Sequence, residues 1–218
     1  MHHRYPDWLR YVFDRNIEGE GWYIDIDLEP FQADESELAE FIELTCLNSG
    51  ADLSAFSDAQ VSRGLHFIFN PSCSNTVFAL RGPEVPIDLR VRAIRSMQYL
   101  YSDCFDKRCT EVFSDKVGAP VSDLNEVCYM LWDVAPIGRW TDEQGAHARL
   151  VASLEVLKSA LTLRNSACIE SALHGLGHLH SYAPEPVESI VDTWVKSQPR
   201  VPQELIRYAA AARVGNVQ

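Results

Sequence analysis

Three residues in the C-terminal half have the types and the spacing of a metal-binding or polar binding site: Glu170, His174 and His178. They recur every four residues, so in a helix their side chains form one line along the axis. We call this set the Glu–His–His stripe. The apolar residues that mark the buried side, roughly opposite the stripe, are Ile169, Ala172, Leu173, Leu176 and Leu179. Two imidazoles and a carboxylate can bind a divalent metal ion, but the same pattern also suits a peptide-binding face or a plain exposed surface.

Other patterns that carry chemistry are absent from the sequence. The Glu and His order of zinc proteases does not occur around the stripe, and no glycine-flanked serine accompanies a histidine and an aspartate. The segment Gly175-Leu176-Gly177 is too short to cradle a phosphate. We therefore expect a non-enzymatic protein without a cofactor. The alternative is a metal-binding protein or a metal-dependent enzyme that uses the stripe.

The negative charge of the chain is concentrated in its first quarter. Residues 1–60 contain 14 acids and 3 bases, a net of −11, whereas residues 61–218 contain 17 acids and 16 bases, a net of −1. No Lys or Arg occurs from Asn16 to Ser62. Such a field attracts a basic partner and repels nucleic acid and anionic membranes. We therefore expect a basic protein as partner, and neither nucleic acid nor a membrane.

The acids of this region accompany large apolar side chains such as Trp22, Phe31 and Phe41, as acids do at folded interfaces. An acidic surface that only aids solubility is the alternative. The carboxylates that we expect to bind the partner are Asp25, Asp27, Glu29, Asp34, Glu35, Glu37, Glu40 and Glu43.

The basic residues outside this region do not form a nucleic-acid patch. Arg90, Arg92 and Arg95 cluster in one predicted helix, but the charge around them is balanced and no aromatic residues alternate with them. We expect them to form ion pairs with acids such as Asp88 or Asp103.

Six cysteines are scattered along the chain without the paired spacing of a zinc site. The first residues lack the apolar run of a signal peptide, and no stretch approaches the roughly 18 apolar residues of a membrane span. We therefore expect a cytoplasmic protein with reduced, mostly buried thiols.

Helical periodicity extends along most of the chain and predicts an all-α fold in one domain, 1–218. The predicted helices begin at or near Pro6, Asp34, Ser57, Pro86, Ser122, Thr141, Asn165, Pro184 and Pro202. The exception is residues 22–29, which alternate apolar and polar residues and predict a short extended segment. We distinguish an acidic N-terminal portion, residues 1–85, from a helical stack, residues 86–218.

Several predicted helices share a local pattern. Ile94, Ile169 and Ile206 lie 75 and 37 residues apart, close to multiples of the length of a paired-helix repeat. The segment Asn165–Leu179 contains Ala-Leu-His-Gly-Leu-Gly, and a second predicted helix follows it at Pro184–Lys196. Two further segments show weaker versions of the pattern, Val91–Leu100 and Pro202–Ala212.

On these residues the chain resembles HEAT/armadillo helical-repeat proteins, mainly over residues 86–213. The resemblance implies stacked helix pairs in an α-solenoid-like arrangement, a curved surface that binds protein or peptide, and no chemistry. Together with the acidic N-terminal portion, it predicts a protein that binds a basic partner. One form of such a protein is a bacterial immunity protein that neutralises a toxin.

Overall fold

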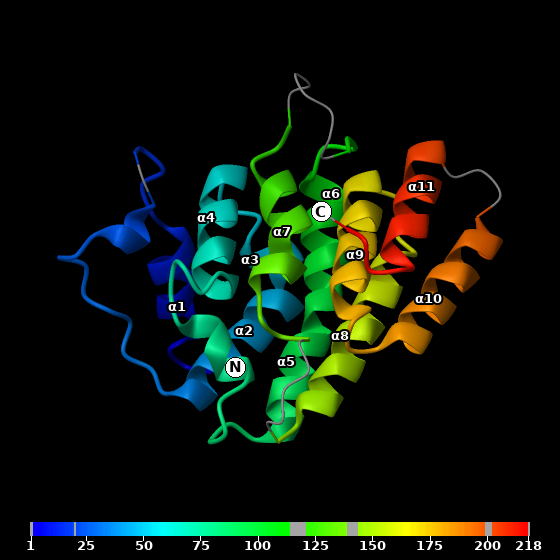
Figure 1. The fold of residues 1–218 in the computed structure, drawn as a ribbon. Helices are drawn as coiled ribbons and strands as arrows, with labels where there is room; N and C mark the ends of the chain where they lie inside the picture. The colour runs from blue at the N-terminus through cyan, green and yellow to red at the C-terminus, as the bar shows by residue number, and fades with distance from the viewer. Residues whose placement is uncertain (1, 20, 114–120, 139–143, 199–201, 218) are drawn as a thin grey trace.

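A computed structural model describes residues 2–19, 21–113, 121–138, 144–198 and 202–217. All regular elements in these ranges are helical, which confirms the predicted all-α fold (Figure 1). In chain order they are α1 (Tyr5–Phe13), η1 (Trp22–Ile24), α2 (Glu35–Leu47), α3 (Ser49–Asp52), α4 (Asp58–Phe69), η2 (Thr76–Leu80), α5 (Ile87–Tyr99), η3 (Leu100–Phe105), α6 (Asp106–Arg108), α7 (Leu124–Val134), α8 (Ala146–Ala160), α9 (Ser166–Leu179), α10 (Pro184–Ser197) and α11 (Gln203–Ala212).

The helices pack in two rows, and spatial neighbours within a row are mostly not consecutive in the chain. One row contains α1, α4, α7, α9 and α11, and the other contains α2, α5 and α8 (Figure 1). The rows meet where α1 contacts α2 and where α8 contacts α9, while α10 packs on α9 and α11. This arrangement is compatible with stacked helix pairs, and the assignment to a solenoid family stays a prediction.

Helix starts follow the capping signals of the sequence. Asp34 and Glu37 form a reciprocal capping box at α2, and Ser57 and Gln60 form another at α4. The Asn165 side chain accepts a hydrogen bond from the first turn of α9. The predicted start of a helix at Thr141 lies outside the described residues, and that helix is described from Ala146 onward.

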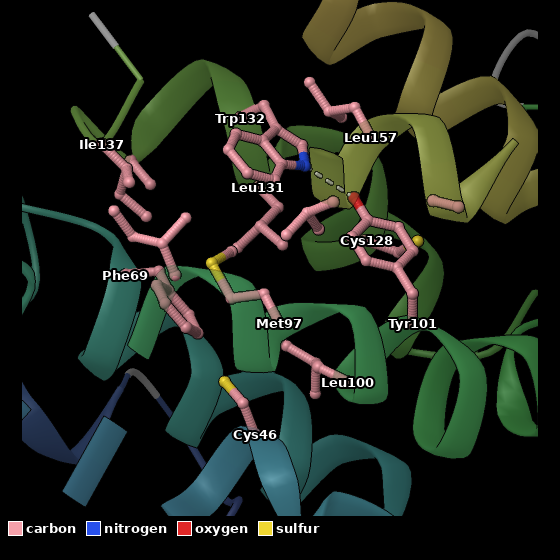
Figure 2. Close-up of a cluster of buried hydrophobic side chains, with 14 of the residues drawn as sticks. Cys46, Phe69, Met97, Leu100, Tyr101, Cys128, Leu131, Trp132, Ile137 and Leu157 are labelled. Carbon is pink, nitrogen blue, oxygen red and sulfur yellow. Dashed lines mark hydrogen bonds between the residues drawn. The ribbon is translucent and has the colours of Figure 1, made fainter. Parts of the chain in front are cut away.

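One hydrophobic core extends through both rows of helices and across the junction between residues 1–85 and 86–218. It contains Met97 and Leu100 from the helical run that begins with α5, with Leu131 and Leu157 packed nearby (Figure 2). Two polar atoms within this cluster satisfy each other, because the Trp132 indole donates a 2.8 Å hydrogen bond to the Tyr101 hydroxyl. This buried pair therefore fixes how α7 docks on η3 rather than weakening the core.

The cysteines are free, and five of the six are buried; only Cys73 is half-buried. This agrees with the prediction that they act as small apolar side chains. Burial raises the pKa of Cys46 and Cys104 to about 12, so both are neutral thiols at physiological pH.

A long helical run extends from Ile87 to Arg108 and contains a π-helical turn, η3, in its middle. The π-turn has one residue more per turn than an α-helix, and it directs Tyr101, Cys104 and Phe105 to the buried side. The run therefore maintains its packing against α2 and α8 at one end and against α3 at the other.

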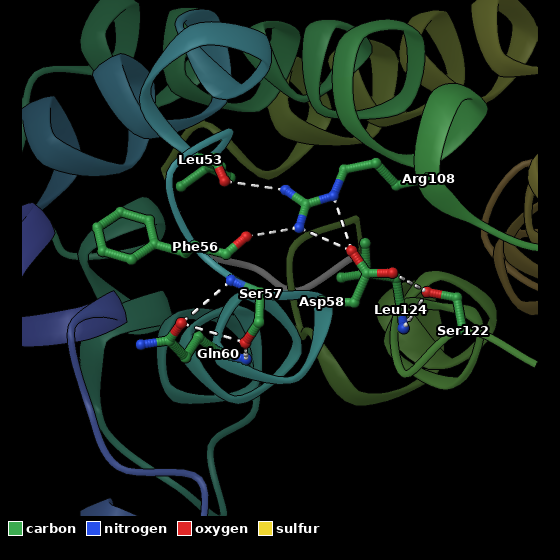
Figure 3. Close-up of polar contacts among 8 residues, drawn as sticks. All are labelled: Leu53, Phe56, Ser57, Asp58, Gln60, Arg108, Ser122 and Leu124. Carbon is green, nitrogen blue, oxygen red and sulfur yellow. Dashed lines mark hydrogen bonds and ion pairs between the residues drawn. The ribbon is translucent and has the colours of Figure 1, made fainter.

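Arg108 ends this run and joins three segments of the chain (Figure 3). Its guanidinium donates to the carbonyl oxygens of Leu53 at 2.9 Å and Phe56 at 2.8 Å, and it pairs with the Asp58 carboxylate at 2.7 Å. The other Asp58 oxygen accepts a 2.8 Å hydrogen bond from Ser122, just before α7. The Asp58 side chain, at the start of α4, thus contacts both Arg108 at the end of α6 and Ser122 just before α7.

The predicted extended segment at residues 22–29 is wrong. Its first residues form one 3-10 turn, η1, followed by turns, and the described ranges contain no β-strand. Ile26 is 96% exposed and Ile24 is 53% exposed, so the alternating apolar side chains do not cover a core. A strand needs a neighbour with unused backbone groups, and helices use theirs internally.

The prediction for the three arginines of α5 is confirmed at two positions. Arg92 pairs with Glu43 at 3.0 Å and with Asp88 at 2.9 Å. Arg95 pairs with Glu155, which the sequence did not indicate.

Arg90 differs from the prediction, because it is buried and donates to the backbone carbonyls of Arg81 and Gln144. Asp103, the other expected partner of these arginines, pairs with Lys107 instead.

No helix in the described ranges is long and apolar enough to cross a lipid bilayer.

Candidate functional site

The eight predicted partner-binding carboxylates divide into two groups. Asp25, Asp27 and Glu29 lie on the exposed segment that follows η1, and Glu35 is exposed in the first turn of α2. Glu40 is half-buried further along α2.

The remaining three carboxylates, Asp34, Glu37 and Glu43, have roles inside the fold. Asp34 caps α2, Glu37 pairs with Arg4 at 2.8 Å, and Glu43 pairs with Arg92. The exposed acidic surface is therefore narrower than the sequence indicated, because helix periodicity does not show which acids meet a base from another element.

Two exposed acids border an aromatic cleft of about 680 Å³ in the N-terminal portion. Asp25 and Glu35 both line it, and the Glu35 carboxylate lies so close to Gly82 that a Cβ there would clash with it. The aromatic residues of the lining are Trp8, Tyr11, Tyr23, Phe31, Phe67 and Phe78. We call this feature the acidic aromatic cleft.

Rings of the cleft, and the Trp22 ring that packs on Tyr11, already hold guanidinium groups of the chain itself. The Arg15 guanidinium lies 4.5 Å from the Tyr11 ring centroid and 4.8 Å from that of Trp22. Arg4 lies 5.1 Å from the Phe31 centroid. Aromatic faces attract cations through their quadrupoles, so this surface has the chemistry that receives an Arg or Lys side chain.

The Glu–His–His stripe lies on α9 as predicted, but it is not opposite the buried side. Glu170 is 6% exposed and His174 only 2%, whereas His178 is half-buried. The expectation failed because α9 is surrounded, packing against α7, α8, α10 and α11. Helical periodicity identifies a polar face, but it does not show that another helix covers that face.

A residue that the sequence did not indicate completes a cluster with the two histidines. His178 Nε2 lies 3.0 Å from His174 Nε2 and 3.5 Å from Oδ1 of Asp133, near the end of α7. One nitrogen or oxygen atom from each of the three residues lies within 4.8 Å of the others. We call this group the Asp–His–His cluster. Glu170 is not part of it, and no sequence signal connects Asp133 with α9.

Two tyrosines contact the His174 ring of the cluster. The Tyr208 hydroxyl lies 2.6 Å from His174 Nδ1 and 3.0 Å from the Tyr129 hydroxyl. The Tyr129 ring also packs on the His174 ring, with centroids 4.3 Å apart. His174 is thus fixed by contacts with both α7 and α11.

Burial governs the protonation of this group. Burial and the nearby His178 lower the pKa of His174 to about 4, against the opposing effect of Asp133. Burial and the hydrogen bond to Tyr129 raise the pKa of Tyr208 well above its usual value. At neutral pH His174 is therefore an uncharged imidazole and Tyr208 an uncharged phenol, and a neutral imidazole has a lone pair to share.

No family model, curated protein or solved structure matches this chain, so the resemblance to HEAT/armadillo proteins stays a prediction from its residues.

Proposed function

We propose that this chain is a non-enzymatic, cytoplasmic helical-repeat protein of the HEAT/armadillo type that binds a basic protein partner through its N-terminal portion. The acidic aromatic cleft supports this proposal most directly. It combines cation-binding rings with the carboxylates of Asp25 and Glu35, which belong to the stretch from Asn16 to Ser62 that contains no Lys or Arg. A basic side chain of the partner would insert among the rings and meet a carboxylate at the rim.

The surface around the cleft extends the same chemistry. Asp27 and Glu29 are exposed beside it, and Ile24 and Ile26 present apolar surface on the same segment. Exposed apolar side chains with a charged surround are typical of protein interfaces rather than of solubilising surfaces. The negative field would increase the association rate of a positively charged partner and disfavour nucleic acid and anionic membranes.

A toxin-neutralising role is the specific form of the proposal that the charge favours. Toxins that act on nucleic acid present basic surfaces, because they must attract phosphates. An acidic protein that covers such a surface would block substrate access. This form rests on analogy of charge, and it predicts that the partner is toxic when produced alone and harmless when produced with this chain.

The test combines capture of the partner with a matched pair of variants. Tagged protein is mixed with its native lysate at low salt, eluted with a salt gradient, and the eluate is identified by mass spectrometry. The cleft variant Asp25→Asn/Glu35→Gln is compared with Glu185→Gln/Glu204→Gln, which removes the same charge from exposed positions on α10 and α11.

The expected result is one stoichiometric basic protein that leaves the cleft variant at clearly lower salt than the wild type and the control variant. A partner that leaves all three proteins at the same salt would show that the cleft is not the interface. An eluate without a basic protein would contradict the proposal and leave the acidic region as a solubility feature.

A further inference from the structure

We propose that the Asp–His–His cluster binds a divalent transition-metal ion, with zinc as the preferred type, through His174 Nε2, His178 Nε2 and a carboxylate oxygen of Asp133. This site is independent of the proposed partner surface. It lies between α7 and α9, whereas the acidic aromatic cleft belongs to the N-terminal portion.

The distances suit a single ion. Zinc binds imidazole nitrogen at about 2.0–2.1 Å and carboxylate oxygen at about 2.0–2.2 Å, so two ligand atoms of one tetrahedral ion lie roughly 3.3–3.6 Å apart. The two histidine Nε2 atoms are 3.0 Å apart, and His178 Nε2 is 3.5 Å from Asp133 Oδ1. All three ligand atoms fit within 4.8 Å, so small side-chain rotations would bring them onto one ion.

The surroundings orient His174 as metal sites require. Its Nδ1 faces the Tyr208 hydroxyl at 2.6 Å, and Tyr208 in turn reaches Tyr129 at 3.0 Å. If Nδ1–H donates to Tyr208 and Tyr208 donates to Tyr129, the proton is on Nδ1 and the Nε2 lone pair faces the cluster. Hydrogen bonds of this kind fix the tautomer and the ring orientation of metal-binding histidines.

The position of the cluster leaves room for exchange with solvent. His174 is buried, while the side chains of His178 and Asp133 are about one-third exposed, at 33% and 36%. An ion held there would have protein ligands on its inner side and water on its outer side. Three protein ligands leave one coordination position of the ion open to water or to a further ligand.

Close packing of α7 on α9 holds the ligands together. Gly175 lies opposite Trp132, the neighbour of Asp133 in the chain, and a Cβ at Gly175 would come within 2.8 Å of the Trp132 ring. The missing side chain lets the two helices approach, and this approach brings Asp133 next to the histidines of α9. The cluster is therefore a product of core packing and not of a mobile surface segment.

A metal-free structure is the rival that the experiment must exclude. In it, Tyr208 donates to His174 Nδ1, and Nε2–H of His174 donates to His178 Nε2. The 3.0 Å separation of the two Nε2 atoms fits a hydrogen bond as well as it fits a shared ion. The two arrangements differ in the protonated nitrogen of His174, which NMR of ¹⁵N-labelled imidazole measures directly.

The test is titration of untagged protein with Zn²⁺ by calorimetry and with Co²⁺ by visible spectroscopy. Four variants are compared. Asp133→Asn and His178→Gln remove ligands, Tyr208→Phe removes the hydroxyl beside His174 Nδ1, and His180→Gln removes a nearby histidine that pairs with Glu188 instead. All carry His2→Gln/His3→Gln, because adjacent histidines at the N-terminus could bind metal on their own. Circular dichroism confirms that each variant is folded.

We expect one Zn²⁺ per chain and a Co²⁺ spectrum without thiolate charge-transfer bands. Affinity should fall at least tenfold in Asp133→Asn and His178→Gln and stay unchanged in His180→Gln. Tyr208→Phe leaves all three ligands in place and should weaken binding less than removal of a ligand. The proposal is overturned if no ion binds, if the ligand variants bind as tightly as His180→Gln, or if His174 remains protonated at Nε2 in saturating Zn²⁺.

Discussion

Arg108→Met tests whether one arginine holds the N-terminal helices to the rest of the fold. The wild-type guanidinium makes four contacts of 2.7–2.9 Å, two with Asp58 and one each with the carbonyls of Leu53 and Phe56 (Figure 3). Methionine retains much of the apolar stem but removes all of these contacts. Because the other groups stay in place, the substitution leaves two carbonyl oxygens and one Asp58 oxygen without the guanidinium, while Ser122 still donates to the other Asp58 oxygen.

The expected loss follows from the exposure of the ion pair. A hydrogen bond to a charged group contributes about 1.5–3 kcal/mol when it is buried. The Arg108 and Asp58 side chains are 22% and 37% exposed, so water replaces part of what is lost. We expect the free energy of unfolding to fall by about 2–4 kcal/mol, which for a chain of this size lowers the melting temperature by roughly 5–15 °C.

Urea unfolding measures this loss, and Arg95→Met provides the matched control. Arg95 also pairs with a carboxylate, Glu155, but both side chains are 49% exposed, so its loss should be below about 0.5 kcal/mol. The double variant Arg108→Met/Asp58→Asn should destabilise by clearly less than the sum of the single variants, because the two residues share one interaction. Equal losses for Arg108→Met and Arg95→Met would refute the reasoning.

Three other perturbations have defined outcomes. Tyr101→Phe removes a hydroxyl that two buried groups share, at 2.7 and 2.8 Å, and should cost about 2–3 kcal/mol in urea unfolding; a neutral result would mean that these groups find other partners. Gly175→Ala should lower the free energy of unfolding by about 1–3 kcal/mol through overpacking, because a Cβ there meets buried side chains at 2.7 Å. The control Gly177→Ala places its Cβ against a side chain near the C-terminus and should lower the free energy of unfolding by less than about 1 kcal/mol. Burial lowers the pKa of His66 below its unfolded value of 6.5. The neutral imidazole therefore leaves the folded state at full stability well above pH 6.5, and this stability is lost as the pH falls. His66→Gln should reduce the slope of melting temperature against pH below pH 6.5, and an unchanged slope would assign that slope to other groups.

Local signals in the sequence predicted much of the fold. Capping residues at Asp34 and Ser57 marked helix starts, and helical periodicity predicted the helix that begins after Pro86. These signals act within one turn of a helix, so they can be read without knowledge of the neighbours. The prediction of an extended segment at residues 22–29 was wrong for the same reason, because an alternating pattern carries no information on whether a partner strand exists.

The candidate sites depend on contacts between distant segments, and the sequence predicted them only in part. His174 and His178 were identified by their spacing, but Asp133 lies 41 positions before His174 and Tyr208 lies 34 after it. Only the packing of α7 and α11 on α9 brings them together. Likewise, composition revealed an acidic N-terminal portion, but only the fold shows that Glu37 and Glu43 serve internal ion pairs.

The π-turn at Leu100–Phe105 has a consequence for the length of related chains. It accommodates one residue more than an uninterrupted α-helix would need over the same rise. A natural deletion of one residue within it would convert the turn to α-helix and keep both flanking stretches facing their present neighbours. A deletion elsewhere between Ile87 and Arg108 would rotate one half of the run by about 100° and expose its apolar side, so length polymorphism in this helix should concentrate at those six positions.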